Sequence, residues 1–215
     1  MTTVKEFLEP TAIIDSNNEQ VDRFALDGIG DATDPSERAI RLYHRVRDGI
    51  RYDPFSIDMT VKGLRASTTL VAGRGWCVAK AALLAACCRA AGIPARVGFA
   101  DVRNHLSTDR MHRFMQTDVF YWHGYTAIHL GDAWVKATPA FNIELCRRFG
   151  VKALDFDGQH DALYHPLDTV GHRHMEYIRY RGEFADVPVD DIVSTFERRY
   201  PLYRKWKQLA ENAGS

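Results

Sequence analysis

Apolar residues recur at helical spacing between residues 35 and 50, three or four positions apart. They are Ala39, Ile40, Leu42, Tyr43, Val46 and Ile50. Asp34 and Pro35 come directly before them, and an acidic cap followed by proline is typical of a helix start. Pro54 cannot continue a helix. The pattern therefore predicts an amphipathic helix that begins near residue 35 and ends before Pro54.

A second helix is predicted over residues 76–91, which are rich in alanine and leucine and apolar on nearly every side. Gly73 and Gly75 mark a loop before it, Gly92 is suited to end it, and Pro94 lies just beyond. A helix without a polar face must be covered all round, so we expect it at the centre of the fold.

The pattern changes after this helix to runs of aromatic and β-branched residues, which are typical of strands. Residues 95–102, 118–122, 123–130 and 133–138 are the predicted strands, and Gly131 with Asp132 forms a hairpin turn. Outside these strands we expect a short strand or lead-in at 10–15, loop over most of 17–34, a short helix at 143–150, irregular chain over 151–172, and helices at 189–197 and 202–209. Helices followed by strands predict an α+β fold, in which an antiparallel sheet packs on the central helix.

Composition and charge limit the classes of function. The chain has 215 residues, 46% hydrophobic and 26% charged, which suits one ordinary domain. Its 28 basic and 28 acidic residues cancel, so nothing favours nucleic acid or an anionic membrane as partner. The N-terminus lacks a secretory signal, no apolar run is long enough to span a membrane, and the four cysteines form no C-x-x-C pair. We expect a cytoplasmic protein with reduced thiols, and the sequence leaves the oligomeric state open.

Cys77 is the strongest candidate for chemistry, because it follows a glycine-rich loop and opens the buried helix. Unpaired N–H groups and the helix dipole favour a thiolate at such a position, and the thiolate is the nucleophile. The same N–H groups suit the oxyanion of an acyl-transfer intermediate. The alternative is that Cys77 is a small apolar residue of the helix, as we expect of Cys87 and Cys88.

His123 is the candidate base. It begins a predicted strand of the hairpin, and an imidazole lying against the Cys77 helix could take the thiol proton and return it to a leaving group. A single histidine in a strand is more often structural. The combination of His123 with Cys77 is more specific than either residue.

These residues resemble the transglutaminase-like superfamily, which includes cysteine proteases and amidases. The matching segments are residues 73–77, Tyr52-Asp53-Pro54, 91–97 and 123–135, within a core of about 35–142. The resemblance implies a papain-like arrangement with Cys77 as nucleophile and His123 as base. It also implies one transglutaminase-like domain over 1–215, with residues 143–215 as a C-terminal extension packed on the core.

The third catalytic position departs from this family. The family has an aspartate before proline, whereas this chain has Thr138 before Pro139, fifteen residues after His123. A threonine hydroxyl can accept a hydrogen bond from an imidazole but cannot balance imidazolium charge. Either the site is weakened, or another residue takes the place of the acid. The candidates for that role are Asp155, Asp157 and Asn142.

Further residues are candidates for the substrate cleft. Trp76 adjoins the nucleophile, Asn104 follows a strand, and His160 and His165 lie in a polar, aromatic-rich stretch that could form a lid. Histidines 160, 165, 172 and 174 match no closed zinc spacing, so we expect no metal, and nothing indicates a cofactor.

The function predicted from these residues is cysteine-dependent acyl transfer, with hydrolysis of an amide or peptide bond as the first choice and a peptide or protein as substrate. One alternative is a catalytically weak or inactive binding module of the same fold, which the loss of the acid at Thr138 favours. Another is transfer from a thioester to an amine, as in arylamine acetyltransferases, whose Arg-Gly-Gly lead-in is similar to Arg74-Gly75.

Overall fold

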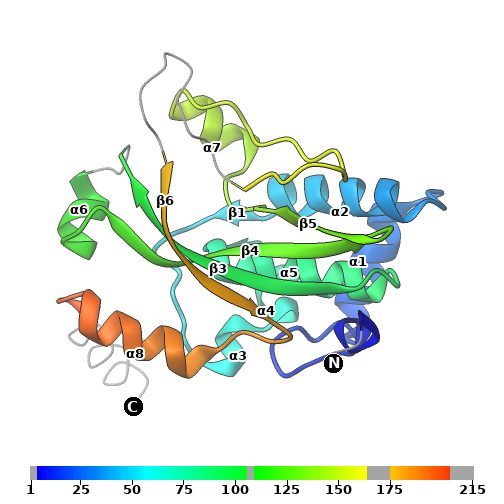
Figure 1. Cartoon of the computed structure of the whole chain (residues 1–215), viewed down its shortest axis with the longest axis horizontal. Helices are drawn as coiled ribbons and strands as arrows, with labels where there is room; N and C mark the ends of the chain where they lie inside the picture. The colour runs from blue at the N-terminus through cyan, green and yellow to red at the C-terminus, as the bar shows by residue number, and fades with distance from the viewer. Residues whose placement is uncertain (1–3, 106–108, 164–174, 204–215) are drawn as a thin grey trace.

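The computed structural model describes residues 4–105, 109–163 and 175–203 (Figure 1). The elements, in chain order, are η1 (Val4–Leu8), α1 (Glu19–Ile29), α2 (Pro35–Gly49), β1 (Arg51–Tyr52), α3 (Val61–Leu64), α4 (Ala66–Ala72), β2 (Arg74–Gly75), α5 (Cys77–Ala90), β3 (Ala95–Asn104), α6 (Asp109–Met115), β4 (Val119–Leu130), β5 (Ala133–Ala137), α7 (Ile143–Arg148), β6 (Met175–Phe184) and α8 (Val189–Arg199).

Four strands form the main sheet in the order β5-β4-β3-β6, and every neighbouring pair is antiparallel. A separate parallel pair joins β1 to β2, with Tyr52 opposite Gly75. In Figure 1, α5 lies behind the sheet, and α8 lies along one end of it. Helices α1, α2 and α4 contact α5, which in turn contacts β3 and β4. This is the predicted α+β fold.

Helix α5 is buried because its sequence offers no polar face. Every residue from Cys77 to Arg89 is buried, and alanines allow the neighbouring helices and strands to approach closely. Its one lysine, Lys80, is also buried, and its ammonium donates to the carbonyls of Arg47 (2.9 Å) and Ile50 (2.5 Å) at the end of α2. Lys80 thereby satisfies carbonyls that a helix end leaves open.

Helix α2 begins and ends where the sequence predicts. The carboxylate of Asp34 accepts the N–H of Glu37 at 2.9 Å, and Pro35 is the first helical residue. The helix ends at Gly49, before Pro54. The face that carries Ala39, Leu42, Tyr43 and Val46 is buried.

Several expectations about the flanking segments were wrong. Most of residues 17–34 form α1, which is capped by Asn18 and buries Val21, Ala25 and Ile29. Residues 10–15 form no strand, and the strands expected at 118–122 and 123–130 are one strand, β4. The sequence did not reveal β6. Helix α8 is confirmed, whereas most of the helix expected at 202–209 lies outside the described residues.

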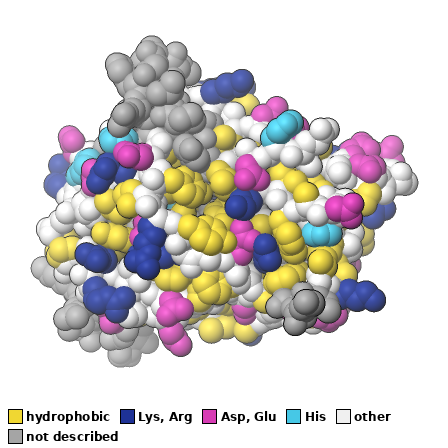
Figure 2. Space-filling model, in the orientation of Figure 1, with side chains coloured by type: hydrophobic (Ala, Val, Ile, Leu, Met, Phe, Trp, Pro, Cys, Tyr) yellow, Lys and Arg dark blue, Asp and Glu magenta, His cyan; other side chains and the backbone are white. Residues whose placement is uncertain are grey.

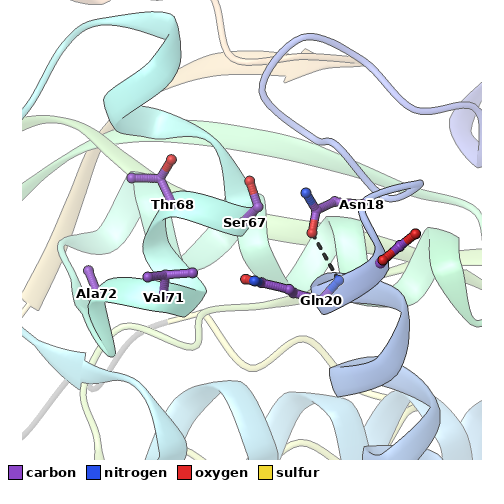
Figure 3. Close-up of a pocket in the computed structure, with 7 residues that line it drawn as sticks. Asn18, Gln20, Ser67, Thr68, Val71 and Ala72 are labelled. Carbon is purple, nitrogen blue, oxygen red and sulfur yellow. Dashed lines mark hydrogen bonds between the residues drawn. The ribbon is translucent and has the colours of Figure 1, made fainter.

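The viewed face of the molecule carries apolar and charged side chains side by side (Figure 2). Figure 2 shows apolar side chains gathered over the middle of the viewed face, with charged side chains among them. A groove of about 540 Å³ lies between the start of α1 and α4 and is lined by Asn18, Glu19, Gln20, Ser67, Thr68, Val71 and Ala72 (Figure 3). None of the predicted site residues lines this groove. No helix in the described ranges has the length and apolarity needed to cross a membrane.

Candidate active site

Cys77 is the first residue of α5, directly after Trp76. The chain reaches it through β2, where Gly75 lies so close to its neighbours that an added Cβ would stand 3.0 Å from Thr69 Cγ2 and 3.2 Å from Ala79 Cβ. Glycine at this position therefore allows the tight entry into the helix. Cys77 is 7% exposed at the N-terminus of this helix.

Strand β4 crosses the first turn of α5 at Gly124. A Cβ at this glycine would lie 2.9 Å from Val78 Cα and 3.2 Å from the Cys77 carbonyl oxygen. The backbone N–H of Gly124 also lowers the pKa of the Cys77 thiol. His123 is the preceding residue and is 2% exposed. The structure thus brings the backbone that carries His123 against the turn that carries Cys77.

The protonation of Cys77 differs from the sequence-based expectation. Burial raises the pKa of its thiol to about 11, although the backbone N–H groups of Gly124, Val78 and Cys77 itself act to lower it. Desolvation disfavours the charged form more than these donors favour it. The resting sulfur is therefore a thiol, and a base has to remove its proton for attack.

Aromatic side chains from distant segments pack beside the start of α5. Burial chiefly raises the pKa values of Tyr52 and Tyr200, and the nearby Cys77 sulfur raises both further. Tyr200 directly follows α8, and the ring of Phe196 in that helix lies 4.8 Å from Tyr200 and 6.0 Å from Trp76, between centroids. Helix α8 therefore packs against Trp76, the residue before Cys77. Neither tyrosine was predicted as a site residue, although Tyr52 belongs to one of the family-like segments.

The third position lies deep in the fold. Thr138 is 4% exposed, its N–H donates to the carbonyl of Ala162 at 2.8 Å, and its own carbonyl accepts from the Tyr43 hydroxyl at 3.3 Å. Its hydroxyl oxygen is buried and has no hydrogen-bond partner within the described ranges. The role of Thr138 in orienting His123 stays a prediction.

Asn142, one of the alternatives, is buried and joins two parts of the site. Its side-chain oxygen accepts the backbone N–H of Tyr52 at 3.2 Å. Asn142 therefore contacts Tyr52, whose pKa the nearby Cys77 sulfur raises.

Asp155 and Asp157 are exposed. Asp155 lies 3.3 Å from the Nε2 atom of His44. Asp157 lies 2.8 Å from the His160 ring nitrogen, and this bond lowers the pKa of Asp157 and raises the pKa of His160. Each of these carboxylates thus pairs with a histidine side chain, and Asp157 also accepts the backbone N–H groups of Gln159 and His160.

The predicted cleft residues are dispersed. Trp76 is buried against Phe196. Asn104 ends β3, where its N–H donates to the Asp118 carbonyl at 3.0 Å. His160 is exposed in the turn it shares with Asp157. His165 lies outside the described residues, as do the histidines at 172 and 174.

The comparison with protein families agrees with this geometry. Residues 22–139, more than half of the chain, match the model of the transglutaminase-like superfamily. The protein belongs to that superfamily. The match includes Cys77, His123 and Thr138, and it begins before the core boundary predicted from the sequence.

A solved structure shares the fold. The chain is similar to the "Putative Cysteine Protease from Cytophaga hutchinsonii" at 16% identity and a TM-score of 0.50, covering 84% of this chain and 54% of the other. It is also similar to a "putative protease from Parabacteroides distasonis" at 19% identity and a TM-score of 0.40, covering 61% and 24%. The chain thus spans about half the length of the first of these proteins. No curated protein matches it.

Proposed function

We propose that the protein is a cysteine-dependent acyl-transfer enzyme that hydrolyses an amide or peptide bond. The observation that carries this proposal is the close packing of Gly124, the residue after His123, on the first turn of α5, where backbone N–H groups lower the pKa of the Cys77 thiol against the effect of burial. A cysteine at a helix start beside a histidine-bearing strand has the parts that nucleophilic catalysis needs. Membership in the transglutaminase-like superfamily supports it.

The proposed reaction begins with the neutral thiol. His123 takes the proton of Cys77 as the sulfur bonds to the substrate carbonyl carbon, and N–H groups at the start of α5 stabilise the oxyanion. The carbon–nitrogen bond then breaks, and the imidazolium returns its proton to the departing amine. Water, deprotonated by the same imidazole, hydrolyses the thioester and regenerates the thiol.

The substrate we propose is a peptide or protein amide. The compartment we propose is the cytoplasm. The four cysteines are free and buried in the structure, and a reducing compartment would keep the nucleophile active.

The proposed function predicts an acyl-enzyme at Cys77. Treated with p-nitrophenyl acetate and quenched in acid, the protein should carry an acetyl group on the peptide that contains Cys77, and Cys77→Ala should abolish both the adduct and turnover. Cys146→Ala is the matched control, because burial also raises the pKa of that thiol to about 11. Acetylation spread equally over Cys77 and Cys146, or unchanged turnover in Cys77→Ala, would refute the nucleophile.

The second candidate function is a binding module of this fold. It is favoured by the Thr138 hydroxyl, which has no hydrogen-bond partner among the described residues. We expect Thr138→Val to keep turnover within about twofold and to raise the free energy of unfolding by about 1 kcal/mol, because it removes a buried polar group without a described partner. Denaturant titration and the p-nitrophenyl acetate assay measure both. A tenfold loss of turnover would instead assign the orienting role to Thr138.

Thr138→Asp separates the two functions, because it restores the carboxylate typical of the family. A large gain in turnover would identify a site that has lost its orienting acid and favour the binding module. A loss of turnover in the folded variant would identify a working site built around threonine.

A further inference from the structure

A β-bulge lies in β4 directly before His123. Ala100 pairs with His123 and Val102 pairs with Phe120, so Asp101 alone faces two residues, Tyr121 and Trp122. An extra residue on one strand bends that strand and changes the direction of the side chains next to it. We call Tyr121 and Trp122 the β4 bulge.

The β4 bulge forces Trp122 into a backbone conformation that bulky residues avoid. Its φ is 60°, and Gln116 is the other non-glycine residue with positive φ in the ranges that the structure describes. Such a conformation persists only where the surroundings hold it. Contacts with neighbouring residues therefore have to stabilise this conformation of Trp122.

Side chains accept both N–H groups of the bulge. The carboxylate of Asp101 accepts the N–H of Trp122 at 3.2 Å, and the hydroxyl of Tyr200 accepts the N–H of Tyr121 at 2.8 Å. Asp101 is 3% exposed. A buried carboxylate thus replaces the ladder partner that the bulge removes.

Arg181 in β6 fixes this carboxylate. Its Nε lies 2.9 and 3.0 Å from the two oxygens of Asp101, and its Nη2 lies 2.7 Å from one of them. The guanidinium carbon also lies 5.2 Å from the centre of the Trp122 ring, which packs against Phe99 and Phe184. One bidentate pair therefore connects β3, β4 and β6 at the bulge.

We propose that Asp101, held by Arg181, is a positioning residue for His123, because it fixes the bulge that sets which way the next side chain points. The proposal rests on the proposed function, in which His123 is the base. Side chains alternate across a strand, so a one-residue change of register would turn His123 to the other face of the sheet. Gly124 is packed on α5 and Trp122 is held by Asp101, so His123 is fixed from both sides.

The experiment uses full-length protein labelled with ¹⁵N-histidine, with the His123 ring signals assigned by their loss in His123→Ala. In Asp101→Ala we expect these signals to shift and the acetylation rate of Cys77 by p-nitrophenyl acetate to fall about tenfold. Asp101→Asn keeps an oxygen that can accept the Trp122 N–H, so it should restore most of the rate. Asp118→Ala is the matched control, since it breaks an exposed pair with Arg103 of β3 (3.0 Å) away from the bulge.

Unchanged His123 signals and an unchanged rate in folded Asp101→Ala would overturn the proposal, as would equal changes in Asp118→Ala. If Asp101→Ala does not fold, Arg181→Gln decides, and wild-type His123 signals with a wild-type acetylation rate in that variant would overturn the proposal. Failure of the proposed function is detected separately, because His123→Ala would then leave the acetylation of Cys77 unchanged. In proteins that keep His123, the ring signals would still report its position.

Discussion

Replacing His123 by alanine is expected to lower the rate of Cys77 acetylation at pH 7 about a thousandfold, within the range typical for loss of a general base. The reason lies in the thiol. With a pKa of about 11 it is ionised in about one molecule in ten thousand at pH 7, so a base has to remove its proton during attack. Rates of p-nitrophenolate release measure the effect.

The pH dependence of His123→Ala gives a second readout. Without the imidazole, attack depends on the small fraction of thiolate, which rises about tenfold for each pH unit below the thiol pKa. The residual rate should therefore climb steeply up to about pH 11, whereas the wild-type rate should vary less. His129→Ala is the control, because His129 lies in the same strand against Trp134. Equal rates and pH profiles for wild type and His123→Ala would contradict the base.

The sequence predicted the centre of the fold because its signals are local. Apolar residues on every side of 76–91 require burial, and glycines bound the segment on both sides. Asp34 and Pro35 likewise determine where α2 begins within a few residues. Such signals need no knowledge of distant contacts.

The elements that the sequence missed depend on contacts between distant segments. Strand β6 pairs with β3 about eighty residues earlier, and its run of Arg179, Tyr180 and Arg181 has no clean alternation because two register shifts interrupt the pairing. Arg181 is polar but half-buried by its pair with Asp101. Helix α1 was read as loop because polar residues outnumber the three residues that it buries.

In the candidate site, too, some features follow from local sequence and others from contacts between distant segments. Cys77 and His123 stand out through residue type and spacing, and the resemblance follows from them. The direction in which the thiol pKa shifts could not be predicted, because burial raises it and residues more than one hundred positions later, such as Phe196 against Trp76, contribute to that burial. The β4 bulge is equally hidden, since a positive φ at a tryptophan contradicts the preference of that residue type.

Gly124→Ala is expected to reduce both stability and turnover, and it tests whether the contact of β4 with α5 sets the geometry of the site. The added Cβ would stand 2.9 Å from Val78 Cα, a backbone atom that cannot rotate away, so strand and helix have to separate. Overpacking of this kind costs about 1–3 kcal/mol of the free energy of unfolding. A shift of about 1 Å between nucleophile and base can cost about a hundredfold in turnover.

Gly49→Ala is the control for Gly124→Ala, because a Cβ at Gly49 would meet nothing within 4 Å. Denaturant titration measures the first effect, and p-nitrophenyl acetate turnover at a temperature where both variants are folded measures the second. The turnover result carries the argument, because a glycine that served packing alone would lower stability and leave the rate of the folded molecules intact. A hundredfold loss in folded Gly124→Ala, with none in Gly49→Ala, would mean that the spacing between the His123 strand and the Cys77 turn determines the reaction rate.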